Sequence, residues 1–362
     1  MKTWLGAALA GMLLAAGCTG SLPPAKQLSR PAQAGGTWIQ GVNHASLEYG
    51  SPQVGAAPCA GDGPFGVAQM QTLEAQWNSD MVRIPLSANN WLGDYDAIHG
   101  THYAVEGDLC PGYDTEVRAL VGAAAQAGIY IMLTLAYVDP CGSVVKNQAG
   151  AGYVLPGEAE AVHFWQTLAS DSVIASNRYV WLDAYSEPHD ISWQEWYGGG
   201  QVTQVADSHR AGCTYEAAGM SELAAVMRAS APLRPIVISG NNWGGDITQI
   251  NNYSFSESNL YFGVHIYPGG PSATDESNWP TFFANMDRYK VIATEFGAHD
   301  CSTQWVSDLM SYLRVHAEGM IAWGYNKGPC EGPRLLDGAG QVNPYGESIR
   351  SFYLQERDVK WA

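Results

Sequence analysis

Positive charge is scarce in this sequence of 362 residues. Only 18 lysines and arginines stand against 35 aspartates and glutamates, which gives a formal net charge of −17. A surface of this sign repels the phosphate backbone of nucleic acids and anionic membrane surfaces. We therefore exclude nucleic acids as partners. With 46% hydrophobic and 15% charged residues, the chain is nevertheless far too apolar to be disordered.

The sequence also lacks the cysteine and histidine spacing of a metal site. None of its seven cysteines forms a Cys-x-x-Cys pair, so a zinc site is not predicted. His99 and His102 in "HGTH" have no third ligand nearby, and we predict neither a metal nor another cofactor. Six cysteines remain besides Cys18, and an even number in an exported protein indicates disulfides.

Long apolar runs are missing as well. Residues 1–17, "MKTWLGAALAGMLLAAG", are too short to span a membrane and stay there, and they predict a secretion signal. "LLAAGC" resembles the lipobox of bacterial lipoproteins, although Ala15 replaces its usual leucine; lipidation at Cys18 is predicted, with an ordinary cleaved signal as the alternative. Residues 18–36 are small, polar and proline-bearing, as in a tether. We expect a protein anchored to the bacterial outer membrane by lipid alone, on its periplasmic or cell-surface face, or otherwise secreted.

Eight β-rich runs alternate with segments of helical periodicity over residues 37–362. Apolar residues at a spacing of three to four predict the helices, and the near-continuous apolar runs suit parallel strands covered on both faces. This alternation predicts a single (β/α)8 barrel domain. A doubly wound open sheet is the alternative, but its glycine-rich phosphate loop is missing after the first run. The predicted strands are 37–46, 81–87, 129–137, 179–187, 235–243, 261–269, 290–298 and 320–326, and the predicted helices include 67–77, 114–128, 158–170, 215–230, 278–289 and 301–319.

Polar and aromatic residues gather at the ends of these runs. In a (β/α)8 barrel the carboxyl ends of all strands meet at one mouth, where activity is found. The sequence therefore predicts one site there, built from Asn43, His44, Arg83, Tyr137, Glu187, Asn241, Asn242, Trp243, His265, Tyr267, Glu295, Trp323 and Asn326.

The six remaining cysteines lie in the loops of the same face. Cys301 and Cys330 follow neighbouring strands, so we expect them to pair. The pairs Cys59–Cys110 and Cys141–Cys213 are plausible for the same reason, although connectivity cannot be deduced from sequence alone.

Two glutamates end predicted strands that face each other across the mouth. Glu187 precedes Pro188, which stops the strand ladder and holds the backbone extended. Glu295 ends the run in "ATEFG". Retaining glycosidases need two carboxyls about 5–5.5 Å apart, one as acid and base and the other as nucleophile. This pair can supply both.

Six short motifs follow one another along the chain, and they are "GVN", "VRIP", "EPH", "HIY", "TEFG" and "AWGY". In this order they resemble glycoside hydrolase family 5, of the large clan of retaining (β/α)8 glycosidases. The resemblance runs from about residue 37 to 326 and implies that Glu187 is the acid/base and Glu295 the nucleophile. It places Arg83 and Tyr267 beside the nucleophile, His265 in the same site and Trp323 under the sugar at the cleavage point.

The residue before the acid/base departs from the family pattern. The family has an asparagine there that bonds the 2-hydroxyl of the sugar, and this chain has Ser186. A serine hydroxyl reaches less far than an amide and cannot offer its donor and acceptor together. Either another residue makes the contact, or a water bridges it, or the preferred sugar is not plain glucose. The family's histidine after the third strand is also missing, where this chain has Tyr137.

We therefore expect a retaining β-glycanase that cleaves β-linked poly- or oligosaccharide. A β-1,4-glucan is the default substrate implied by the resemblance, and mannan, xylan or a bacterial exopolysaccharide stays open. Trp243 is a further candidate for stacking on sugar. The alternatives are a non-catalytic carbohydrate-binding lipoprotein on the same barrel and a transglycosylase that remodels glycans. Oligomeric state is not predicted.

Overall fold

The computed structural model describes residues 38–45, 47–48, 65–92, 112–138, 140–141, 152–207, 210, 212–269 and 276–355. All of them belong to one compact unit, residues 34–362. The predicted signal 1–17, the tether 18–36 with Cys18, His99, His102, Cys59 and Cys110 lie outside the described residues. The predictions made for them stay predictions.

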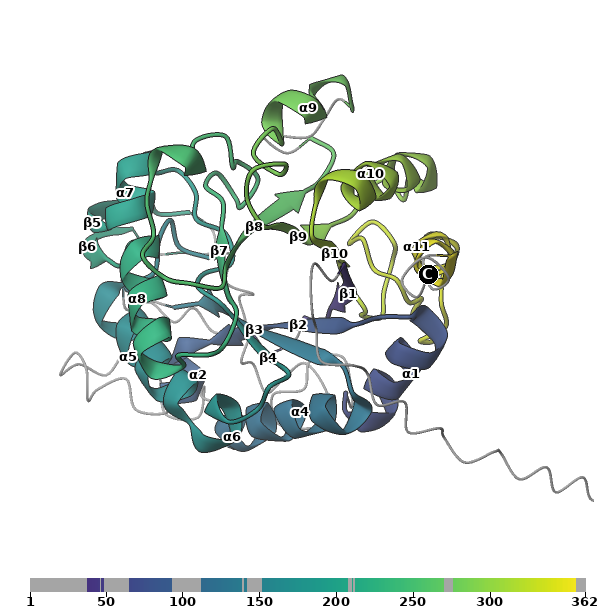
Figure 1. Cartoon of the computed structure of the whole chain (residues 1–362), viewed down its shortest axis with the longest axis horizontal. Helices are drawn as coiled ribbons and strands as arrows, with labels where there is room; N and C mark the ends of the chain where they lie inside the picture. Colours follow the sequence, from purple (N-terminus) through teal and green to yellow (C-terminus); the bar gives the residue numbers. More distant parts are fainter. Residues whose placement is uncertain are drawn as a thin grey trace, which may run out of the picture. The chain divides into compact units, whose positions relative to one another are not determined.

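Eight parallel strands close into a barrel, with helices outside the ring (Figure 1). Neighbouring strands are β1, β2, β3, β4, β7, β8, β9 and β10, and β10 closes the ring on β1. This confirms the predicted (β/α)8 architecture. The bounds are β1 (Ile39–Asn43), β2 (Met81–Ser87), β3 (Tyr130–Tyr137), β4 (Val180–Asp183), β7 (Ile236–Ser239), β8 (Leu260–Ile266), β9 (Val291–Phe296) and β10 (Gly319–Ala322).

The helices follow the predicted periodicity. On α1 the spacing buries Met70, Leu73 and Trp77 against the barrel, and the bounds of α1 and α5 are those predicted. Among the described residues, no helix combines the length and apolar character needed to cross a membrane. The bounds are α1 (Val67–Trp77), α2 (Ala88–Leu92), α4 (Tyr113–Ala127), α5 (Glu158–Ser170), α6 (Ser172–Ala175), α7 (Trp193–Gly198), α8 (Met220–Ser230), α9 (Trp279–Phe282), α10 (Thr303–His316) and α11 (Pro344–Gln355), with 3₁₀ turns η1 (Ile250–Asn252) and η2 (Glu276–Asn278).

Several predicted boundaries differ from the structure. The strands predicted over 235–243 and 320–326 end at Ser239 and Ala322. The helix predicted over 215–230 begins only at Met220, because residues 215–217 belong to β6 (Cys213–Ala217), which pairs antiparallel with β5 (Gly200–Gln204). Exposure alternates from residue to residue along β6, as in a strand. The spacing of apolar residues over 215–230 had indicated a helix instead. The helix predicted over 278–289 shortens to α9, and turns follow it, in which Met286 N donates to the carbonyl of Phe283 at 2.9 Å. The fourth barrel strand ends at Asp183, four residues before Glu187.

The inside of the barrel changes from apolar to polar toward the mouth. Met81, Met132, Trp181 and Val237 belong to an apolar cluster with neighbours on the other strands. Side chains two positions apart on a strand share a face. Two residues further along the same four strands the buried side chains are polar: Arg83, Thr134, Asp183 and Ser239. This polar layer lies directly under the candidate site.

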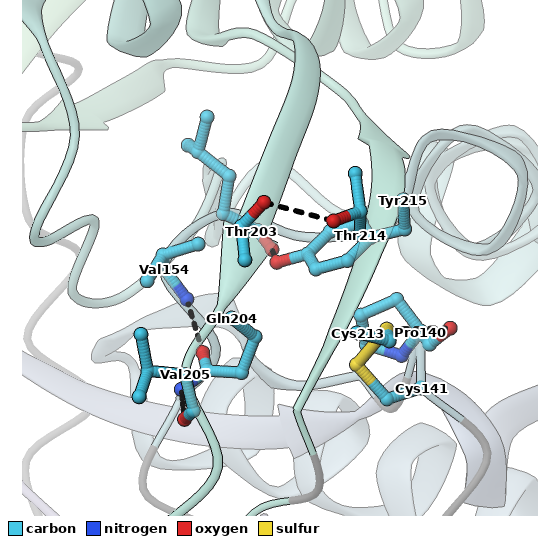
Figure 2. The surroundings of a disulfide bond; sticks show 10 residues. Pro140, Cys141, Val154, Thr203, Gln204, Val205, Cys213, Thr214 and Tyr215 are labelled. Carbon is cyan, nitrogen blue, oxygen red and sulfur yellow. Dashed lines mark hydrogen bonds between the residues drawn. A yellow bond between two sulfur atoms is a disulfide. The ribbon is translucent and has the colours of Figure 1, made fainter.

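Two disulfides tie loops on the mouth side together. Cys141 pairs with Cys213 and Cys301 with Cys330, at Cα–Cα distances of 5.6 and 5.7 Å. The sequence predicted the second pair and left the first as one plausible pairing. The first joins the loop after β3 to the start of β6 (Figure 2).

Candidate active site

Arg83 on β2 is the centre of the site. Its side chain is fully buried and donates five hydrogen bonds to groups on four other parts of the barrel. Burial alone would lower the pKa of Arg83, but the ion pairs with Asp183 and Glu295 outweigh it and raise that pKa. The acceptors are Asp183 Oδ2 at 2.9 Å, Asn43 Oδ1 at 3.0 Å, Glu295 Oε1 at 2.6 Å, Thr134 Oγ1 at 3.3 Å and Ser186 Oγ at 3.0 Å.

Asp183 is a member of the site that the sequence did not single out. It is the last residue of β4 and is fully buried, with Arg83 Nε on one oxygen and Ser239 Oγ at 3.4 Å from the other. Burial raises the pKa of Asp183 above the ordinary value, and Arg83 opposes the shift. The sequence signal for Asp183 was its charge within an apolar strand. A charged side chain is seldom buried without a partner, so this position indicated a buried ion pair.

Glu295 is held from two sides. Arg83 donates to its Oε1, and the hydroxyl of Tyr267 donates to its Oε2 at 2.8 Å. Burial, followed by the charges of Glu295 and Glu187, raises the pKa of Tyr267 well above the ordinary value, so the phenol keeps its proton and stays a donor. The side chain of Glu295 is 7% exposed. This carboxylate is therefore fixed in orientation before any substrate arrives.

Glu187 faces the same space but is more open to solvent. Its side chain is 31% exposed, and its Oε1 lies 2.9 Å from His265 Nδ1, which is also 3.6 Å from Glu295 Oε2. Oxygens of both glutamates and the nitrogen of His265 all lie within 4.8 Å of one another. Contacts of the flanking backbone hold the segment, since Ser186 N donates to the carbonyl of Leu135 at 2.9 Å. The structure therefore brings the two predicted glutamates together.

A tight loop after β7 supports His265. Asn242, Trp243 and Gly244 have φ of 55°, 61° and 69°, a left-handed run that glycine and asparagine adopt readily and that is uncommon for tryptophan. A Cβ on Gly244 would come 2.9 Å from Cγ of His265, so glycine lets the loop lie against the imidazole. The carbonyl of Gly244 accepts from the backbone N–H of His265 at 3.0 Å.

The two candidate tryptophans lie on either side of this centre. Trp243 is half-buried in the loop after β7, and its backbone N–H donates to the carbonyl of Pro188, next to Glu187. Trp323 directly follows β10, is also half-buried, and donates its N–H to the carbonyl of Phe296, next to Glu295. Each is thus tied to the backbone beside one glutamate.

Among the described residues, two groups have ligand atoms close enough together to hold a metal ion. One of them consists of Glu187, His265 and Glu295. Both carboxylate oxygens of Glu295 already accept hydrogen bonds, one from Arg83 and the other from Tyr267. A second such cluster consists of Cys301, Cys330 and Glu331, but its two sulfurs form a disulfide. These contacts leave Glu295 poorly placed to ligate an ion, and the expectation of no metal stays a prediction.

The protein is a parallel (β/α)8 barrel with two facing carboxyls at its mouth. Arginine and tyrosine fix one carboxyl, and histidine contacts the other. This combination is typical of the barrel glycoside hydrolases. The family model described as Cellulase (glycosyl hydrolase family 5) matches residues 41–328, well over half of the chain. The chain belongs to this family, as the motifs predicted.

Individual relatives are distant. Endoglucanase EG-II of Hypocrea jecorina is 23% identical over 293 residues, which cover 72% of this chain and 60% of the relative. The catalytic domain of Thermobifida fusca endoglucanase Cel5A, solved in complex with cellotetraose, has a TM-score of 0.60 at 13% identity and covers 88% of this chain and 92% of that one. A Saccharophagus degradans β-glucanase, also solved in complex with cellotetraose, has a TM-score of 0.57 at 15% identity, and the match covers 88% of each chain. At these identities the solved structures establish the fold.

Proposed function

We propose that this protein is a retaining β-glycoside hydrolase, with Glu187 as acid/base and Glu295 as nucleophile. The observation that carries the proposal is that one carboxylate oxygen of Glu187 and one of Glu295 lie within 4.8 Å of each other. Retention requires about 5–5.5 Å between carboxyls, whereas inversion requires about 6.5–9.5 Å to leave room for a water. The spacing supports direct attack by one carboxylate.

The surroundings of the two glutamates support different roles. Glu295 accepts from Arg83 and Tyr267, and both bonds stabilise a carboxylate rather than an acid. A nucleophile must be ionised when it attacks the anomeric carbon. Among the described residues, the carboxyl of Glu187 contacts His265 and is the more exposed of the two carboxyls, so an acid at this position can reach a leaving oxygen.

In the proposed reaction Glu187 protonates the glycosidic oxygen while Glu295 forms a bond to the anomeric carbon and the glycosidic bond breaks. The departing sugar carries away the proton. Glu187, now a carboxylate, removes a proton from water, whose oxygen displaces Glu295. The second displacement restores the original configuration and both protonation states.

The proposed substrate is a β-1,4-glucan. Its support is the cellulase description of the family and the cellotetraose found in two of the similar structures. Stacking of sugar faces on Trp323 and Trp243 is part of the same proposal.

The test compares wild type with Glu295→Ala, Glu187→Ala and the exposed control Glu276→Gln on panels of β-glucans, mannans and xylans. We expect product from wild type and the control, none above about 0.1% from Glu295→Ala, and the β-anomer first in a proton NMR time course. Equal product from wild type and Glu295→Ala would end the proposal. Products longer than the substrate would identify a transglycosylase, and binding without product in wild type would identify a carbohydrate-binding protein.

A further inference from the structure

His189 lies two residues after Glu187 and has no part in the reaction proposed above. The residue is 1% exposed, and its backbone N–H donates to the carbonyl of Val154 at 3.1 Å. Its imidazole stacks on the indole of Trp243, with ring centroids 3.5 Å apart and 14° between the planes. A polar ring buried this deeply beside the acid/base needs partners for both nitrogens.

Both partners are present, and together they define the tautomer. Nε2 lies 3.0 Å from Nη1 of Arg210, and a guanidinium can only donate, so Nε2 must carry the lone pair. Nδ1 lies 2.8 Å from the carbonyl oxygen of Glu187, which can only accept, so Nδ1 must carry the hydrogen. The ring is therefore a neutral link from Arg210 to the backbone of Glu187. Burial, assisted by the charge of Arg210, lowers the pKa of His189 to about 4, which keeps the ring neutral near pH 7.

Arg210 reaches this position from outside the barrel. It follows β5 and precedes β6, the hairpin that the (β/α)8 pattern does not require. Asp207 fixes the guanidinium through Nε at 2.9 Å and Nη2 at 2.6 Å, and Nη1 also donates to the carbonyl of Gly152. The guanidinium lies over the Trp243 ring, 5.8 Å from its centroid.

Several contacts anchor the hairpin to the segment that follows β3 (Figure 2). The Cys141–Cys213 disulfide ties β6 to the loop after β3, and Gln204 Oε1 accepts from the N–H of Val154 at 3.2 Å. Tyr215 donates its hydroxyl to the carbonyl of Leu155 at 2.6 Å. The same segment 152–155 thus receives the hairpin and accepts the backbone N–H of His189.

We propose that His189, held as the Nδ1–H tautomer by Arg210, is a positioning residue that fixes the backbone of Glu187 and thereby aims its carboxyl at the leaving oxygen. The proposal deepens the function proposed above and rests on it for the role of Glu187. A displacement of about 1 Å in an acid can cost a rate factor on the order of 100. The hairpin and its disulfide then serve the acid/base from a distance.

Leaving-group dependence separates positioning from a general structural role. Cellotetraose needs a protonated leaving oxygen, whereas 2,4-dinitrophenyl β-cellobioside has a leaving group acidic enough to depart without a proton. The value of kcat/KM reports the first bond cleavage for both substrates. A displaced acid therefore lowers kcat/KM for cellotetraose alone, whereas a generally disturbed site lowers it for both.

Three variants and one control make the test. His189→Phe keeps a flat ring on Trp243 but removes both hydrogen bonds, His189→Asn keeps a donor at the place of Nδ1, and Arg210→Met removes the partner of Nε2. We expect His189→Phe to lower kcat/KM for cellotetraose about 10–100-fold and for the aryl substrate less than ~3-fold. Arg210→Met should act in the same direction, His189→Asn should recover most of the loss, and the distant control His316→Phe should match wild type. Equal losses on both substrates, or no loss on either, would overturn the proposal.

The ¹⁵N NMR shifts of the imidazole of His189 give a readout independent of activity. We expect an unprotonated Nε2 and a protonated Nδ1 in wild type, and a changed Nε2 shift in Arg210→Met, because that nitrogen loses its hydrogen-bond donor. A proton on Nε2 would overturn the proposal whatever the kinetics show. If wild type cleaves neither substrate, the proposed function fails instead, and the NMR pattern still decides the tautomer.

Discussion

Replacing Arg83 by lysine keeps the charge of the buried centre and removes its geometry. Five acceptors surround the guanidinium, and an ammonium offers only three hydrogens from one nitrogen. At least two buried acceptors must therefore lose their bond. Each such loss costs about 1–3 kcal/mol, so Arg83→Lys should lower the free energy of unfolding by about 2–6 kcal/mol.

Urea unfolding at pH 7 measures this difference directly. The matched control is Arg350→Lys, whose pair with Glu347 is 29% and 45% exposed and should contribute only about 0–1 kcal/mol. Activity provides a second readout, because a mobile Glu295 should lower kcat more than it raises KM. If Arg83→Lys destabilised the protein no more than Arg350→Lys does, the guanidinium would not be the organising group of the site.

Two further predictions concern the elements behind Glu187. The pKa of His189 is about 4 in the folded protein, against an ordinary value of 6.5. Between these two pH values the unfolded chain binds a proton that the folded protein does not bind. The free energy of unfolding should therefore fall by up to about 3 kcal/mol as the pH drops from 6.5 to 4. In His189→Phe this component should be absent, and a pH-independent difference between variant and wild type would refute it. Replacing Cys141 and Cys213 by serine should lower the free energy of unfolding in urea by about 2–4 kcal/mol. The loss should be about 0.8 kcal/mol larger than for Cys301 and Cys330, because the paired cysteines are 72 and 29 residues apart in sequence. A larger loss for Cys301 and Cys330 would contradict this chain-entropy argument.

The barrel could be predicted because its signal is local and repeated. Each strand is a short apolar run, each helix an amphipathic segment, and their alternation leaves few topologies. The bounds of β2, α1 and α5 agree with the sequence prediction to the residue. Glu187 and Glu295 could be placed at one mouth because parallel strands in a barrel share their carboxyl ends.

The hairpin and the polar layer could not be predicted in the same way. Strands β5 and β6 are five residues each, and the exposed side of β6 leaves too few apolar residues to separate strand from helix. Asp183 belongs to the site only because Arg83, 100 positions earlier on β2, reaches across β3 to its carboxylate on β4. The pair Arg210 and His189 likewise depends on where the hairpin folds back, which no short motif encodes.

Ser186 connects the two halves of the site through Arg83. Its oxygen accepts from Nη2 while Nη1 of the same guanidinium donates to Glu295. An oxygen that accepts from arginine keeps its own hydrogen for donation. The hydroxyl of Ser186 can thus donate its hydrogen from a position that is set by the same guanidinium that orients Glu295. A change at Arg83 must therefore displace both contacts together, and Arg83→Lys should lower kcat more than the loss of either bond alone would do.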